Sequence, residues 1–373
     1  MTVREYRQKQ AGDKGPGLIR QVRGLLSQKS IGLDLGTHTT RLCLPEDGVV
    51  LSEPSAVAVN RLSGEVTRYG TAAIRLLGRT SAQEEAVRPI RKGAIVDYAR
   101  TLALIQAFIR ESCGSMLRPP RLLISVPASL NDAEKRYVLM AAEEAGAGGV
   151  YLLESVRAAA LGAGLDIKAP FGRLVVDIGA EVTDVAVLSL GGIVVSGTLD
   201  VAGRAFDEAL MDYVRSRHKA LIGELRAEEV KIRIGSVREG NTPEDGKRIS
   251  VNGRSVETGL PVTVPLSPAE LKSAFDGPVQ AIGRQILRVI EKTPPELLPN
   301  IHRGGITLTG GGSQLDGLAE RLSRITGLSC TVAEHPEDCT AEGLLRTLPY
   351  LDDMVEGMLV SDFVHRRTGR YNT

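Results

Sequence analysis

Residues 175–184 read VVDIGAEVTD, and this stretch decides what kind of fold the chain adopts. An apolar run ends at an aspartate, and a glycine two positions later allows a tight turn before the chain becomes apolar again. Consecutive backbone N–H groups in such a turn form a concave anion site, and glycine lets a phosphate approach the backbone closely. Glu181, however, places a negative side chain in the same turn. The stretch therefore predicts a phosphate loop that is either functional or degraded.

The same pattern occurs earlier in the chain. GLDLGTHTTRLCL at 32–44 and VVDIGAEVTDVAVL at 175–188 share a strand-like run, an Asp, a Gly two positions later and a Thr six positions after the Asp. Repetition over this distance indicates a duplicated domain rather than a solenoid. Two such lobes can hold one polyphosphate between their turns. Asp34 and Asp177 are suited to holding Mg²⁺ through its water molecules.

Two more motifs fit a nucleotide. TGGGSQL at 309–315 follows an apolar run and precedes an expected helix, so its amides can face a phosphate or the adenosine. Glu228 and Lys231 lie three apart on one face of a predicted helix and could grip ribose and adenine. Each motif alone has an ordinary alternative, namely a turn or a solvated ion pair. Their combination and order make the signal specific.

Composition narrows the function classes. The chain has 373 residues, enough for two or three domains. A net charge of +1 and an aromatic content of 3% argue against nucleic acid as a partner. Four cysteines without metal-ligand spacing indicate reduced structural thiols. No apolar run is long enough to span a membrane, which predicts a cytoplasmic protein unless it lies on a membrane surface.

Hydrophobic periodicity predicts alternating strands and helices. Asn131 and Glu134 are expected to cap a helix that stops at Gly146, Gly191-Gly192 to form a hairpin, and Asn252-Gly253 to form a turn. The expected strands are 31–36, 39–44, 121–126, 173–179, 183–190, 191–201 and, as the last, 305–311; the expected helical regions are 102–109, 131–146 and 203–236. Residues 151–164 are expected to be a strand tip that leads into a helix, and residues 248–264 a hairpin-like stretch around the Asn252-Gly253 turn signal.

These motifs resemble the actin superfamily and, within it, the bacterial MreB-like rod-shape proteins. The likeness runs from about Ile31 to Leu348 and is most specific in IGLDLGT, SVPASLNDAEKR, GAGGVYLLESVRAAALGAGL and RGGITLTGGGSQLDGL. The resemblance implies an α/β actin-like ATPase fold, with duplicated RNase H-like domains and four subdomains around a central nucleotide cleft.

The expected domain organisation follows from the likeness. Residues 1–30 form a basic extension, 31–172 a first domain with a small insertion at about 57–94, and 173–348 a second domain with an insertion at about 204–265. Residues 349–373 form an amphipathic and basic tail.

The resemblance also assigns a binding site for ATP or ADP with Mg²⁺. Asp34 and Asp177 fall on the positions that hold Mg²⁺ through water. The residues expected to bind nucleotide are Asp34, Gly36, Thr37, His38, Thr39, Asp177, Gly179, Ala180, Gly203, Glu228, Lys231, Gly310, Gly311 and Gly312.

Departures from the family pattern predict weak hydrolysis. Ser155 stands where the family has a Glu that polarises the attacking water, and Val182 where it has a Thr that helps to place it. Loss of both groups would slow hydrolysis on the order of 10²–10⁴-fold. Glu181 replaces a Gly beside the β- and γ-phosphates, and Arg204 is the candidate that offsets its charge. The chain is therefore expected to be at most a slow ATPase, with no confident catalytic residue.

Both termini carry apolar stripes. Leu18, Ile19, Val22, Leu25 and Leu26 form one helical face with basic residues beside it, which predicts an amphipathic helix on an anionic membrane surface. The alternative is a helix packed on its own domain. Residues 351–363 carry a second stripe that is expected to dock on the protein or to bind lipid or a partner.

Three functions are compatible with these features. The first is a filament-forming cytoskeletal protein, peripheral on the inner face of the cell membrane, that organises cell-wall synthesis and cell shape with cell-wall synthesis proteins. The second is a nucleotide-insensitive scaffold or regulator that co-assembles with intact MreB-type paralogues. The third is a sugar kinase, for which the sequence offers no acidic base in the cleft.

Overall fold

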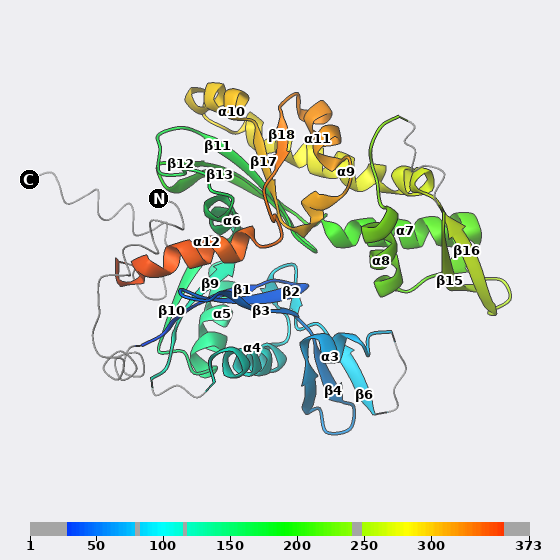
Figure 1. The fold of residues 1–373 in the computed structure, drawn as a ribbon, viewed down its shortest axis with the longest axis horizontal. Helices are drawn as coiled ribbons and strands as arrows, with labels where there is room; N and C mark the ends of the chain where they lie inside the picture. The colour runs from blue at the N-terminus through cyan, green and yellow to red at the C-terminus, as the bar shows by residue number, and fades with distance from the viewer. Residues whose placement is uncertain (1–27, 79–82, 115–117, 241–247, 354–373) are drawn as a thin grey trace, which may run out of the picture.

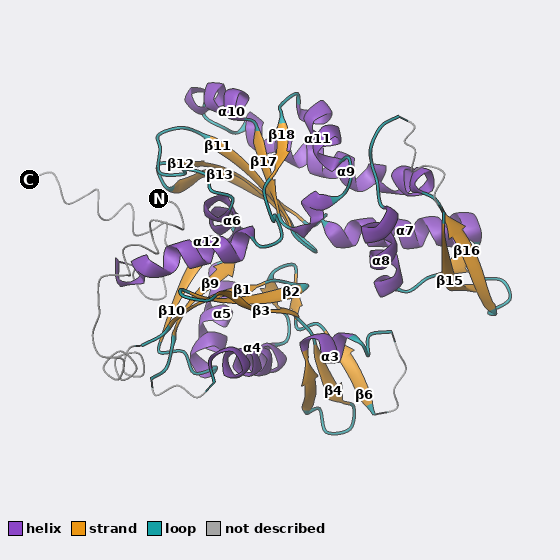
Figure 2. Ribbon diagram, viewed as in Figure 1, coloured by secondary structure: helices purple, strands orange, loops and turns teal. Residues whose placement is uncertain are grey.

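The computed structural model describes residues 28–78, 83–114, 118–240 and 248–353. Its chain forms two halves, each built on a sheet, with a smaller lobe at the end of each half (Figure 1). Helices cover the sheets and alternate with the strands along the chain (Figure 2).

The first half is built on a sheet with the order β10-β9-β1-β2-β3. Its strands are β1 (Ser30–Leu35), β2 (Thr39–Leu44), β3 (Gly48–Pro54), β9 (Arg121–Val126) and β10 (Gly149–Glu154). Strand β1 is antiparallel to β2 and parallel to β9, which is parallel to β10. Helices α4 (Tyr98–Cys113) and α5 (Asp132–Glu144) join its core. The predicted capping box of Asn131 and Glu134 at the start of α5 is confirmed.

The second half repeats this arrangement in the sheet β13-β12-β11-β17-β18. Its strands are β11 (Arg173–Ile178), β12 (Thr183–Ser189), β13 (Gly192–Leu199), β17 (Ile306–Thr309) and β18 (Cys330–Val332). Strand β11 is antiparallel to β12 and parallel to β17, which is parallel to β18, as in the first sheet. Around it lie α7 (Gly203–His218), α9 (Pro268–Glu291), η3 (Pro295–Leu297), α10 (Leu298–Gly304), η4 (Gly311–Gln314) and α11 (Leu318–Thr326). The prediction that 305–311 is the last strand is wrong, because β18 follows; its three residues are too few to show a clear period.

Two smaller three-stranded sheets carry the outer lobes. One contains β4 (Val57–Asn60), β5 (Val66–Tyr69) and β6 (Glu84–Val87), with α3 (Gly70–Ile74) beside it; the other contains β14 (Ala220–Leu221), β15 (Ile249–Ser255) and β16 (Pro261–Leu266), near α8 (Glu224–Ile234). The predicted hairpin over 248–264 is confirmed by the antiparallel pair β15 and β16, but the turn predicted at Asn252-Gly253 is wrong, since both residues lie inside β15. A Cβ on Gly253 would lie 2.6 Å from the carbonyl oxygen of Leu221. The glycine therefore permits close approach of β14 rather than a turn.

Turn geometry also refines one hairpin. Strands β12 and β13 form the expected hairpin, but the residues at its tip are Leu190 and Gly191, both with positive φ. Gly192 is already part of β13. A second tight hairpin joins the short strands β7 (Ile90–Arg91) and β8 (Ala94–Ile95) through Lys92 and Gly93, which also have positive φ.

Helices α6 (Ser155–Gly162) and α12 (Cys339–Thr347) cross between the two main sheets. Helix α6 follows a strand of the first sheet, yet its Val156 and Ala160 pack against the second sheet. Helix α12 follows the second sheet, yet it lies beside the first (Figure 1). Its Leu344 packs with Cys43 and Leu123 of that sheet. Each half therefore supplies a helix to the other.

Helix α12 continues into η5 (Leu348–Asp353), where Leu351 is buried in the same cluster. No helix within the described residues is long and apolar enough to cross a membrane. The predicted membrane stripe at 18–26 and the rest of the C-terminal stripe, from Met354 onward, lie outside the described residues.

Candidate nucleotide site

One cavity of about 930 Å³ lies between the two halves, and three glycine turns line it. This volume is within the range of small-molecule sites. The structure brings every residue of the predicted site to this cavity. They are Asp34, Gly36, Thr37, His38, Thr39, Asp177, Gly179, Ala180, Gly203, Glu228, Lys231 and Gly310 to Gly312, together with the departing positions Ser155 and Val182.

The turns depend on glycines where the backbone is crowded. A Cβ on Gly36 would lie 2.4 Å from the carbonyl oxygen of Thr39. Gly310 has a φ of 78°, and its Cβ would lie 2.4 Å from the carbonyl oxygen of Ile178. Both positions therefore exclude side chains and leave backbone amides near the cavity, which suits a phosphate group.

Carboxylates stand at the ends of the first strands of both sheets. The Ser125 hydroxyl donates to Asp34 at 2.7 Å, and the Thr309 hydroxyl donates to Asp177 at 3.0 Å. Burial raises the pKa of Asp34 above its ordinary value. Burial, with repulsion from nearby Asp184, raises the pKa of Asp177 to about 7. A bound cation would favour the charged forms of both groups.

Asp34 also faces a cation of the chain itself. The Arg41 guanidinium lies 4.0 Å from Asp34 and 2.9 Å from Asp338. Carboxylate oxygens are ligands that Mg²⁺ prefers, so Asp34 and Asp177 fit the metal assignment chemically. Within the described residues, no group of three or more His, Cys, Asp or Glu side chains is arranged to hold a metal ion.

The opposite wall is formed by α7 and α8. The Lys231 ammonium donates to the carbonyl oxygen of Gly203 and to Asp207, both at 2.8 Å. Burial raises the pKa of Asp207 to about 6 even though Lys231 opposes the shift. His38 of the first half contacts Glu228 on α8, with 3.5 Å between the imidazole nitrogen and the carboxylate. The sequence identified Lys231 and Glu228 but missed Asp207. Asp207 lies one helical turn after Gly203 on α7, and this position brings its carboxylate to the Lys231 ammonium.

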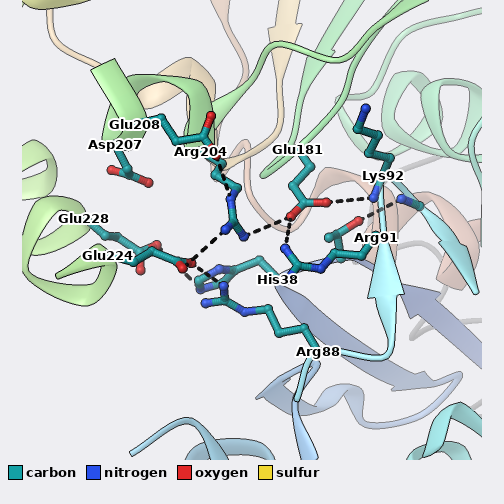
Figure 3. Close-up of polar contacts among 12 residues, drawn as sticks. His38, Arg88, Arg91, Lys92, Glu181, Arg204, Asp207, Glu208, Glu224 and Glu228 are labelled. Carbon is teal, nitrogen blue, oxygen red and sulfur yellow. Dashed lines mark hydrogen bonds and ion pairs between the residues drawn. The ribbon is translucent and has the colours of Figure 1, made fainter. Parts of the chain in front are cut away.

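Glu181 is held by three donors (Figure 3). Its Oε1 accepts hydrogen bonds from the Arg91 and Arg204 guanidiniums, each at 3.1 Å. Its Oε2 accepts from the backbone N–H of Lys92 at 2.8 Å, and the side chain is 9% exposed. The predicted pairing with Arg204 is confirmed. Arg91 and Lys92 were missed, because they come from a distant hairpin with no motif of its own.

The contacts of Glu181 belong to a larger charged network. Arg204 also pairs with Glu224 at 3.3 Å and with Glu208 at 3.1 Å. Glu224 in turn accepts a hydrogen bond from Arg88, whose side chain is 5% exposed. Lys92 pairs with Asp200 at 2.6 Å. The network joins the segment 88–92 of the first half to β11–β12, α7 and α8 of the second half (Figure 3).

The positions expected to activate water carry no strong base. Ser155 begins α6 and lines the cavity beside Val182. The neighbouring Glu154 is buried, and its carboxylate lies 3.6 Å from the Arg157 guanidinium. Neither Glu154 nor Arg157 is among the residues that line the cavity.

Comparisons with known proteins agree over most of the chain. The family described as MreB/Mbl protein matches residues 28–356. The cell shape-determining protein Mbl of Bacillus subtilis is 38% identical over 327 residues, which are 87% of this chain and 97% of that protein. The cell shape-determining protein MreB of Escherichia coli is 38% identical over 341 residues, 90% of this chain and 97% of that protein.

Solved structures give the same result for the fold. MreB5 of Spiroplasma citri, solved bound to AMPPNP, is 31% identical with a TM-score of 0.83, over 87% of this chain and 97% of that one. Its ADP-bound structure also has a TM-score of 0.83, at 31% identity over 88% and 98% of the two chains. The actin-like α/β fold implied by the family resemblance is confirmed.

Proposed function

The chain belongs to the MreB/Mbl family, and on this premise we propose that it is an actin-like cytoskeletal protein that binds an adenine nucleotide and assembles into filaments on the membrane. One observation carries the proposal. Two Asp-bearing glycine turns from duplicated sheets and a third glycine turn converge on one cavity of nucleotide size. The related MreB5 chain has been solved with both ADP and AMPPNP.

Specific side chains would bind the nucleotide. The amides of the turns at Gly36, Gly179 and Gly203 would face its phosphates. The turn at 310–312, with Lys231 and Glu228, would contact the adenosine. Asp34 and Asp177 would hold Mg²⁺ through water, and the metal would neutralise phosphate charge. The division of the chain into domains 31–172 and 173–348, with the cleft between them, is part of the same proposal.

Hydrolysis is proposed to be weak. Ser155 is neutral at pH 7 and cannot serve as a general base, and Val182 has no hydrogen-bonding group with which to orient a water. Glu154 is paired with Arg157 and lies outside the set of residues that line the cavity. We therefore expect nucleotide to act as a bound ligand rather than as a rapidly consumed substrate.

The membrane part of the proposal rests on residues 18–26. Their apolar face and the adjacent Arg20 and Arg23 fit the interface of an anionic bilayer. Localisation on the inner face of the cell membrane, and a role beside cell-wall synthesis proteins, follow from this placement and from the shape-determining relatives.

The test is co-sedimentation and negative-stain electron microscopy of the full chain with anionic vesicles and Mg·ADP or Mg·ATP. We expect filaments on vesicles, and loss of vesicle binding in Leu18→Glu/Leu25→Glu while filaments still form in solution. A chain that stays monomeric under all these conditions, at concentrations where an intact MreB polymerises, would refute the filament proposal.

Two observations favour a second function. The Glu181 carboxylate fills the phosphate turn with its own hydrogen bonds, and Ser155 and Val182 lack the groups that would activate water. In this alternative the chain is a scaffold that co-assembles with an intact MreB-type paralogue and does not respond to nucleotide. The same sedimentation assay separates the two. If this chain sediments only together with a paralogue, and nucleotide does not change the amount that sediments, the scaffold function is favoured. If this chain forms filaments alone, a paralogue is not required for its assembly.

A further inference from the structure

Glu181 lies in the turn between β11 and β12, the second of the two Asp-bearing glycine turns. Its carboxylate already accepts hydrogen bonds from Arg91, Lys92 and Arg204. We propose that Glu181 occupies an anion cradle in the wall of the cleft and makes the cleft selective for nucleoside diphosphates over triphosphates. The inference rests on the proposed nucleotide binding and adds the class of ligand that the site accepts.

The cradle has the donors that a phosphate group would need. Two guanidiniums and one backbone N–H converge on the Glu181 carboxylate from the hairpin at 91–92 and from α7. Guanidinium and amide donors bind carboxylate and phosphate oxygens in the same way. A carboxylate tethered within the same chain has a high effective concentration at this site. It therefore occupies the cradle ahead of a phosphate from solution.

The hairpin that forms the cradle also fixes its position. Lys92 and Gly93 at its tip both have positive φ, as type I′ turns require. The Lys92 N–H donates to Glu181 in the second turn, and the Gly93 N–H donates to the Thr37 hydroxyl in the first turn at 2.8 Å. One two-residue tip therefore connects both phosphate turns, and the cradle lies between them.

Within the part of the chain that the structure describes, every cation of this network is paired with a carboxylate. Its cations are Arg88, Arg91, Lys92 and Arg204, and its anions are Glu181, Glu208, Glu224 and Asp200. The four charges of each sign cancel. A terminal phosphate would either face the Glu181 carboxylate at close range or displace it from both arginines, and both events oppose binding. A diphosphate carries one anionic group fewer and can bind the turn amides without using the cradle.

The test is calorimetric titration of Mg·ADP and Mg·AMPPNP into the full chain and into Glu181→Gln, Glu181→Gly and Glu85→Gln. We expect the wild type to bind Mg·ADP at least about tenfold more tightly than Mg·AMPPNP. Both Glu181 variants should bring the ratio close to one, because Gln removes the charge with little change in size. Glu85→Gln removes an exposed acid that pairs with Arg61, outside both the network and the cavity, and should keep the wild-type ratio.

The other outcomes separate a failure of diphosphate selectivity from a failure of nucleotide binding itself. Equal binding of both nucleotides by the wild type, or an unchanged ratio in the Glu181 variants, would overturn diphosphate selectivity while nucleotide binding stands. Binding by Glu181→Gly alone, with none by the wild type, would show that Glu181 excludes both nucleotides. No binding by any folded variant, with folding checked by thermal unfolding, would overturn both the inference and the proposed nucleotide site.

Discussion

At the residue scale, the site combines glycine turns with side chains that come from distant elements. Glycines after an Asp mark the turns at Gly36 and Gly179, and the structure places both at the cavity. The partners Arg91, Lys92 and Asp207 carry no such signature. Arg91 and Lys92 contribute to the site by binding Glu181, and Asp207 does so by binding Lys231. These contacts join segments that are distant in the chain, and a single sequence does not show which distant segments meet.

The buried aspartates predict a pH dependence of stability in the absence of nucleotide and Mg²⁺. The pKa of Asp177 is raised to about 7 in the folded state, while the unfolded value is about 4. Between these values the folded chain holds a proton that the unfolded chain releases, so stability falls as pH rises from about 4 to about 7. Asp177→Asn should flatten this slope in urea unfolding at pH 5 and pH 8.

The exposed Asp47 in the β2–β3 turn provides the matched control. Asp47→Asn should leave the slope as it is in the wild type. A wild type whose stability rises through this interval while Asp177→Asn shows the same rise would contradict the assignment of a raised pKa to Asp177.

Lys231 is predicted to be important for stability as well as for the site. Lys231→Met leaves Asp207 and the Gly203 carbonyl without their ammonium donor. Loss of charged hydrogen bonds at a largely buried site should lower the free energy of unfolding on the order of 1–3 kcal/mol. Chemical denaturation measures this, with the exposed Arg215→Met on α7 as the control that should change little. Equal stability of Lys231→Met and wild type would show that the contact is dispensable.

At the scale of the elements, strands and helices with a clear period were predictable, and their exchange between the halves was not. The capping box of α5 and the strands around both Asp-Gly turns follow from local sequence. The packing of α6 on the second sheet and of α12 on the first does not, because apolar residues at helical spacing do not specify which sheet they will cover.

The crossing of α6 and α12 depends on a reciprocal pair of glycines. A Cβ on Gly343 would lie 1.8 Å from the carbonyl oxygen of Ala158, and one on Gly162 would lie 1.8 Å from that of Cys339. The two backbones are therefore in direct contact, and no side chain fits between them.

Replacing either glycine should force the helices apart. Gly343→Ala should lower the free energy of unfolding by more than about 2 kcal/mol, because overpacking at a close contact displaces backbone. Gly277→Ala in α9 meets no atom within 4 Å other than those of its chain neighbours and its own helix backbone, and its gain in helix propensity is opposed by the following Pro278, so it should change the free energy of unfolding by less than about 1 kcal/mol. Thermal unfolding of both variants provides the comparison, and a smaller loss for Gly343→Ala than for Gly277→Ala would refute the close crossing.

At the scale of the whole molecule, the charged network should hold the two halves together when no nucleotide is bound. Its most buried link joins Arg88 to Glu224, whereas both members of the Lys92–Asp200 pair are more than half exposed. Exposed pairs contribute little and are screened by salt, so Arg88–Glu224 and the Glu181 contacts should dominate.

Breaking the buried link should open the cleft. In small-angle X-ray scattering of the nucleotide-free protein, Glu224→Gln should show a larger radius of gyration than the wild type, and the difference should grow from about 0.05 M to about 0.5 M salt. Glu208→Gln, which loses a contact within α7 alone, should match the wild type. Identical curves for Glu224→Gln and the wild type would show that other contacts set the angle between the halves.

The exchanged helices have a consequence for how the chain can be divided. A fragment that ends before residue 173 would present α6 without the sheet that covers it, and would lack α12 over its own sheet. The complementary fragment would have the opposite deficiencies. Two separately produced pieces should therefore be insoluble alone and recover structure only when refolded together. The duplicated chain is thus a single cooperative folding unit, because neither half can bury its own apolar surface without the helix that the other half supplies.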